Sequence, residues 1–144
     1  MVGAEERDQT REVFFRAWQA HRHNQPLQGI EKIIVQIVLR HPEYHALLEK
    51  PEVNRERDHF PEVGGINPFL HLGMHIAIEE QLALDQPPGI RECYQKLLRR
   101  LMDEHKVQHQ IMECLGEMLW QSDRSVDTPP DSIYVNCLRR LAEG

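Results

Sequence analysis

Apolar residues recur along this chain at intervals of three and four positions, which is the period of an amphipathic α-helix. No stretch alternates apolar and polar residues over the length of a β-strand. The pattern therefore predicts an all-α fold, a helical bundle of about six helices. A chain of 144 residues is long enough to bury one hydrophobic core, so we expect residues 1–144 to form a single domain.

Prolines, glycines and capping residues divide this pattern into segments. Asn67 and Pro68 are typical of a helix N-cap followed by proline at the first helical position, and Asp103 and Asp131 or Ser132 are further N-cap candidates. Residues 51–66 are charged and rich in proline and glycine, which predicts an irregular connection with room for one helical turn. Residues 125–130 form the predicted loop before the C-terminal helix. Helices are predicted over about residues 8–22, up to 39, 43–49, 68–84, 90–102, 104–121 and from 131 onward.

The composition is that of a soluble globular protein, with 40% hydrophobic and 28% charged residues. A net charge of -6 argues against a nucleic-acid partner, which would favour clustered lysine and arginine. No apolar run approaches the ~20 residues of a membrane span, so no membrane partner is expected. The acidic, polar N-terminus differs from a signal or transit peptide. These features lead us to expect a cytoplasmic protein.

The sequence contains three cysteines, Cys93, Cys114 and Cys137. The count is odd, and no Cys-x-x-Cys spacing occurs. We therefore expect reduced, mostly buried side chains rather than a disulfide framework or a zinc knuckle.

Two predicted helices carry the same arrangement of imidazoles and a carboxylate at intervals of four, namely His71, His75 and Glu79, and His105, His109 and Glu113. This spacing places each trio along one side of its helix. The first trio lies inside an apolar face, whereas the second lies at the margin of one. On the second helix, Gly116 would allow another helix to approach closely.

Imidazole and carboxylate groups within a helical bundle are typical of a site for zinc, iron or manganese. His41 and His45 repeat the spacing but flank Pro42, so only His45 is securely helical. The predicted ligands are His71, His75, His105 and His109, with Glu79, Glu113 and His45 as lesser candidates. A catalytic site would use a metal-bound water with a free glutamate as base, but the sequence identifies no catalytic residue.

The same residues also fit a protein of another class. A helical histidine commonly bonds to a carboxylate four residues on, so each trio can be a buried hydrogen-bond network in a structural or protein–protein interaction module. The sequence contains no glycine-rich phosphate loop, serine nucleophile elbow or His-Glu-x-x-His motif. The sequence does not decide whether the protein is an enzyme or which partner it binds. It also leaves the oligomeric state open, and a homo-oligomer is one possibility.

Four segments of the chain are more specific than these patterns. They are HPEYHALL (residues 41–48), NPFLHLGMH (67–75), EQLALDQPPGI (80–90) and HQIMECLGEMLW (109–120). Together they resemble a bacterial family of uncharacterised function, the domain of unknown function numbered 1841. The likeness extends from about Phe14 to Trp120. It implies a small, helical, cytoplasmic bacterial protein with no assigned activity.

Overall fold

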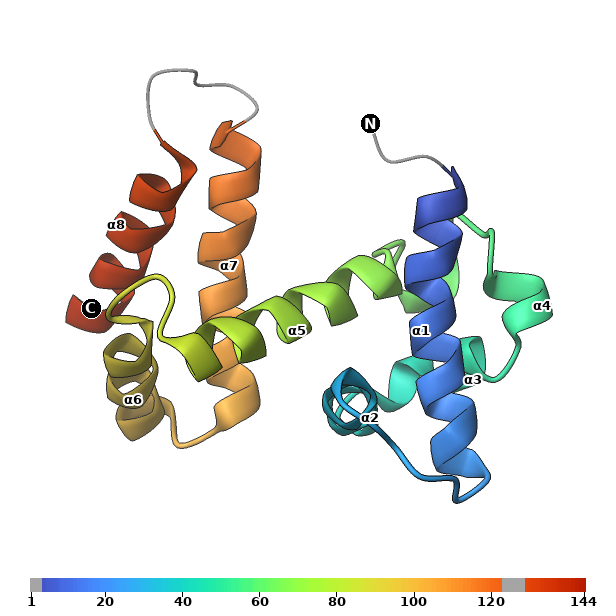
Figure 1. Ribbon diagram of the computed structural model, residues 1–144. Helices are drawn as coiled ribbons and strands as arrows, with labels where there is room; N and C mark the ends of the chain where they lie inside the picture. Colours follow the sequence, from blue (N-terminus) through green and yellow to red (C-terminus); the bar gives the residue numbers. More distant parts are fainter. Residues whose placement is uncertain (1–3, 123–128) are drawn as a thin grey trace. The chain divides into compact units, whose positions relative to one another are not determined.

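The computed structural model describes residues 4–122 and 129–144, and the regular secondary structure of this part of the chain is all helical, with no β-strand (Figure 1). This confirms the predicted all-α class. None of the described helices is both long enough and apolar enough to cross a membrane. The α-helices are α1 (Ala4–Arg22), α2 (Ile30–Leu39), α3 (His45–Leu48), α4 (Pro51–Asn54), α5 (Pro68–Leu84), α6 (Ile90–Leu101), α7 (Glu104–Ser122) and α8 (Pro130–Glu143), with 3-10 turns at Pro42–Tyr44 and Pro61–Val63.

The described helices outnumber the six or so that were predicted, because short turns form around prolines. Pro42, Pro51 and Pro61 each begin a helical turn, since the fixed φ of proline suits the first helical position. Two of these turns, α4 and Pro61–Val63, lie in the connection that was predicted to be irregular. That connection is therefore more ordered than its composition indicated.

The chain divides into two compact units, residues 1–76 and residues 77–144. The boundary falls within α5, so the first half of this helix belongs to unit 1 and the second half to unit 2.

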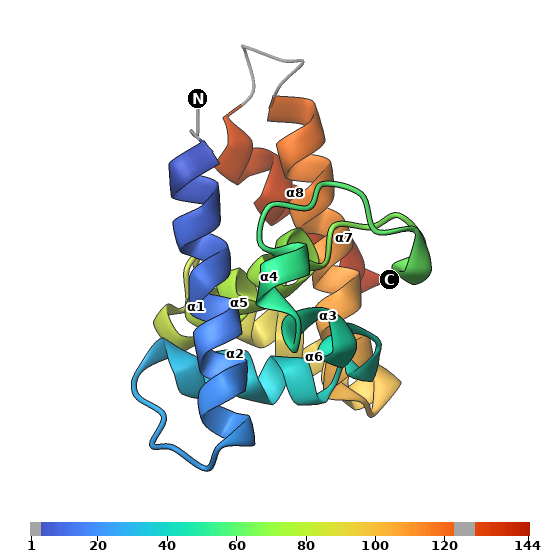
Figure 2. The same ribbon diagram turned by 90° about the vertical axis from the view of Figure 1, so that its right-hand side faces the viewer.

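Unit 1 is built around an aromatic core. Helix α1 packs against α2, which it crosses in Figure 2, and buries Phe15 and Trp18. The ring of Phe69, from α5, lies 5.6 Å from that of Phe15 and 6.0 Å from that of Phe60. Asn67 caps α5 as predicted, since its Oδ1 accepts hydrogen bonds from the backbone N–H groups of Phe69 and Leu70.

A buried arginine fastens the connection of unit 1 to α1. The Nη1 of Arg11 donates to the carbonyl oxygens of Arg55 at 3.1 Å and Arg57 at 2.7 Å. Its guanidinium also lies 4.5 Å from the centre of the Phe69 ring, within range of a cation–π interaction. These contacts satisfy two carbonyls of a segment that has little regular structure of its own.

Unit 2 consists of the second half of α5 with α6, α7 and α8. Helix α8 runs back beside α7, and α6 packs against both (Figures 1 and 2). Asp103 caps α7 as predicted, accepting from the N–H groups of His105 and Lys106. The second half of α5 is attached through hydrogen bonds from Gln108 to Glu79 and from Tyr134 to Gln81.

The predicted start of the C-terminal helix is wrong. Helix α8 begins at Pro130, and neither Asp131 nor Ser132 is its cap. Pro129 precedes it in an extended conformation with ψ 138°, as expected for a residue before proline, and Pro130 takes the first helical position. The predicted loop over residues 125–130 falls largely on residues 123–128, which lie outside the described residues.

The prediction of three reduced cysteines is also wrong. Cys114 of α7 and Cys137 of α8 form a disulfide, with their Cα atoms 5.5 Å apart, and Cys93 is a buried free thiol. The two bonded cysteines are 23 positions apart in sequence but meet where α7 and α8 pack together. An odd count leaves one thiol over but does not prevent the other two from pairing.

Candidate metal-binding histidines

Three histidines come together in unit 1. The ring centres of His41 and His75 are 4.8 Å apart, those of His41 and His71 are 4.9 Å apart, and those of His71 and His75 are 5.0 Å apart. His71 and His75 lie on successive turns of α5, whereas His41 lies just after the end of α2. His41 and His75 are each only 1% exposed. Unit 1 therefore contains a histidine cluster, as a metal site requires.

His41 is not among the predicted ligands, because Pro42 interrupts the helical pattern directly after it. Its Nδ1 lies 2.8 Å from the carbonyl oxygen of Ile37. A carbonyl only accepts, so this Nδ1 carries the proton and Nε2 is the unprotonated nitrogen, the atom that would bind a metal ion. The helix-ending His-Pro pair is the sequence signal for this arrangement, since it leaves the histidine beside the last carbonyls of α2.

His45, a lesser predicted ligand, makes a different contact. Its Nε2 lies 2.8 Å from the carbonyl oxygen of Val38, so Nε2 carries the proton. Its ring centre lies 4.5 Å from that of Trp18. The ring of His45 thus packs on the aromatic core of unit 1.

Tyr44 is a buried neighbour of the cluster that the sequence did not single out. Its hydroxyl oxygen lies 2.8 Å from Nδ1 of His71. Burial raises the pKa of Tyr44 to about 12, with a smaller contribution from the charge of Glu43. The phenol therefore stays protonated at neutral pH, and its hydrogen bond orients the ring of His71.

The second predicted pair lies on α7 in unit 2. The ring centres of His105 and His109 are 4.1 Å apart, and both side chains are half-buried. Gln108, which lies between them in sequence and is 2% exposed, donates from Nε2 to Oε1 of Glu79 at 2.6 Å. Glu79 was a lesser predicted ligand, and in unit 2 one of its oxygens accepts from this amide.

The remaining predictions on α7 concern Glu113 and Gly116. Glu113 is exposed. The expectation that Gly116 admits a close helix is wrong, because a Cβ placed there would meet no described atom within 4 Å. Gly116 lies beside open space, so its small size is not used for packing.

The histidines of each unit offer a metal ion neutral ring nitrogens, donors that suit zinc and iron better than magnesium or calcium. No curated protein and no solved structure matches this chain significantly. Residues 6–140 match the family described as Domain of unknown function (DUF1841). That match covers nearly the whole chain, and it agrees with the resemblance noted in the sequence. The protein therefore belongs to the DUF1841 family.

Proposed function

We propose that this protein binds a transition-metal ion in unit 1 through His41, His71 and His75. The observation that carries the proposal is the cluster in unit 1, where His41 and His75 are almost fully buried with ring centres 4.8 Å apart. Burying polar nitrogen atoms costs free energy unless they are bonded, and a metal ion is one partner that compensates two of them at once. His41 is ready for this role because its proton is on Nδ1.

Unit 2 holds the second predicted pair, His105 and His109, with ring centres 4.1 Å apart. This pair is a separate candidate for metal binding within unit 2.

The donor set favours zinc among the three metals considered. Three imidazoles and one water molecule complete tetrahedral zinc, whereas manganese prefers carboxylate oxygens. The two predicted carboxylate ligands are engaged elsewhere or exposed, since Glu79 accepts from Gln108 and Glu113 faces solvent. A zinc ion with three protein ligands keeps one position open, and a water molecule bound there is the group that catalysis would use.

Metal analysis of protein purified without an affinity tag tests the proposal. After refolding with zinc, iron and manganese offered, we expect about one zinc ion per chain. His41→Ala and His75→Ala should each lose it. His23→Ala, an exposed histidine after α1, is the matched control and should retain it. Less than about a tenth of an ion per chain in the wild type would overturn the proposal.

A hydrogen-bond network without metal is the second candidate, favoured by the bonds of His71 to Tyr44 and of His45 to Val38. On this alternative the histidines are structural groups of a non-catalytic interaction module. It predicts that a chelator leaves the melting temperature unchanged, and that stability changes as pH falls through about 6.5, where an ordinary imidazole becomes charged. A fall in melting temperature with chelator would exclude it.

A further inference from the structure

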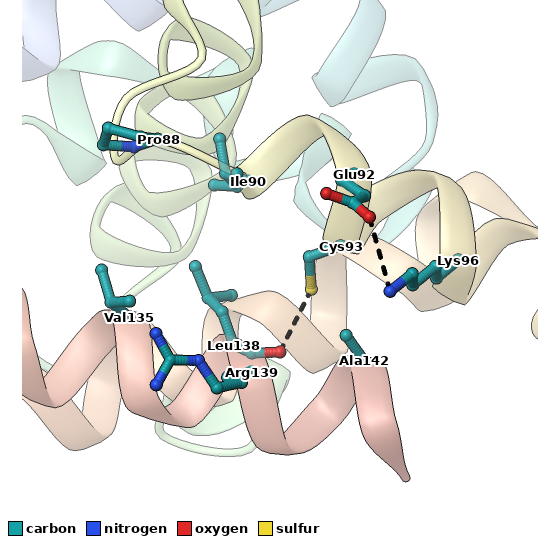
Figure 3. Close-up of a pocket in the computed structure, with 10 residues that line it drawn as sticks. Pro88, Ile90, Glu92, Cys93, Lys96, Val135, Leu138, Arg139 and Ala142 are labelled. Carbon is teal, nitrogen blue, oxygen red and sulfur yellow. Dashed lines mark hydrogen bonds and ion pairs between the residues drawn. The ribbon is translucent and has the colours of Figure 1, made fainter.

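Unit 2 contains a pocket of about 240 Å³ between α6 and α8 (Figure 3). Ile90, Cys93 and Leu138, each at most 5% exposed, line it and form its apolar floor. Val135, Pro88 and Ala142 extend this apolar wall. The volume is slightly below the usual range of ~300–1,000 Å³ for small-molecule sites, so a ligand would have to be small.

Charged side chains also line this pocket. Figure 3 shows Lys96 paired with Glu92, at 3.5 Å between Nζ and Oε1. Arg139 has no ion pair within the described part of the chain, whereas its neighbour Arg140 lies 3.3 Å from a carboxylate oxygen of Glu117. With Lys96 and Glu92 offsetting each other, the pocket wall carries one surplus positive charge, that of Arg139.

The thiol on the floor does not supply a reactive group. Cys93 donates through Sγ to the carbonyl oxygen of Leu138 at 3.3 Å, which Figure 3 shows as a dashed line. Burial raises the pKa of the Cys93 thiol, against smaller opposing effects of Arg100 and Lys96. A protonated thiol is a poor nucleophile, so the floor behaves as an apolar surface.

We propose that this pocket binds a small organic monoanion with an apolar tail, of the class of medium-chain carboxylates. The carboxylate pairs with the guanidinium of Arg139, which can bind both of its oxygens. The tail covers Ile90, Cys93 and Leu138. One uncompensated charge is too little for a diphosphate or a nucleotide, and the apolar floor would leave a purely polar anion without contacts. This inference depends on unit 2 alone and is independent of metal binding.

Titration of ¹⁵N-labelled, full-length protein with octanoate tests the proposal. We expect saturable amide shifts in α6 and α8, with a Kd of about 1 mM or tighter. Acetate, which lacks the tail, and octan-1-ol, which lacks the charge, should each bind at least about tenfold more weakly. If acetate or octan-1-ol bound as tightly as octanoate, this would contradict the proposal that both the carboxylate and the apolar tail contribute to binding.

Arg139→Gln should weaken octanoate binding at least about tenfold. Arg140→Gln, one position along the same helix and already paired with Glu117, is the matched control and should bind as the wild type does. Ala142→Trp, which fills the pocket with a large ring, should abolish binding while the circular dichroism spectrum stays helical. Octanoate binding that Arg139→Gln leaves unchanged, or that shifts amides only outside α6 and α8, would overturn the proposal.

Discussion

Each unit buries one tyrosine whose hydroxyl is hydrogen-bonded inside the fold. Tyr44 bonds to His71 in unit 1, and Tyr134 donates to Oε1 of Gln81 at 2.6 Å in unit 2. Burial raises the pKa of Tyr44 to about 12. Burial, with a smaller contribution from Cys93, also raises the pKa of Tyr134 well above its usual range. Both phenols therefore hold their protons more tightly in the folded chain than in the unfolded one.

This difference predicts a loss of stability in alkali. Above about pH 10 tyrosines ionise in the unfolded chain but stay protonated in the folded one. This ionisation stabilises the unfolded chain, so the free energy of unfolding falls as pH rises toward 12. At pH 11 we expect a loss of roughly 1 kcal/mol for each of the two residues. Urea unfolding between pH 8 and pH 11 measures this loss.

Tyr44→Phe and Tyr134→Phe should each reduce the loss of unfolding free energy between pH 8 and pH 11 by roughly 1 kcal/mol, the contribution of one tyrosine. Their stability at pH 8 will differ from the wild type because a hydrogen bond is lost, so the comparison is between slopes. An unchanged slope in both variants would contradict the assignment of the alkaline loss to these residues.

At the scale of single residues, the sequence predicted some members of the candidate site but not all of them. His71 and His75 follow from helical spacing, and they do lie together in unit 1. His41, Tyr44 and Gln108 were missed because their roles depend on where the chain turns and which helix packs beside them. Arg11 was missed for the same reason, since its acceptors lie more than 40 residues away along the chain.

At the scale of elements, the predicted helix ends are correct where a local signal sets them. Asn67 and Asp103 cap their helices because a side-chain oxygen two or three residues from a free N–H needs no tertiary contact. The pairing of Cys114 with Cys137 is the opposite case. It depends on α8 folding back along α7, which no spacing of cysteines along the sequence reveals.

The disulfide should make a measurable contribution to stability. Cross-linking positions 23 residues apart restricts the unfolded chain, which stabilises the fold by about 3 kcal/mol. Cys137→Ala should lower the free energy of urea unfolding by this amount. Wild-type protein in a thiol reductant should lose a similar amount, whereas the variant should lose no more. Cys93→Ala, which lacks only the free thiol, should keep its sensitivity to reductant.

At the scale of the molecule, the helical class was predictable but the division into two units was not. Residues 68–84 have one continuous helical period, and nothing in that period indicates that its halves belong to different units. A single domain therefore remains a prediction. The proposed metal ion takes its ligands from unit 1, so its stabilising effect should appear in that unit.

The two tryptophans allow this effect to be measured in each unit separately, because Trp18 lies in unit 1 and Trp120 in unit 2. In Trp120→Phe, fluorescence reports on unit 1, and in Trp18→Phe it reports on unit 2. At a free zinc concentration of 100 times Kd we expect the reporter in unit 1 to show a gain of about 2.7 kcal/mol in the free energy of unfolding. A gain seen only by the reporter in unit 2 would contradict the assignment of the ion to unit 1. His75→Ala should remove the gain.

The state of the cysteines has a practical consequence for such experiments. With Cys114 and Cys137 joined and Cys93 only 5% exposed, the described part of the chain presents no accessible thiol. A cysteine introduced at an exposed position should therefore react alone with a maleimide dye. One such position in α1 and one in α8 would carry a donor and an acceptor fluorophore. Energy transfer between them would then give the separation of the two units in solution, with and without metal.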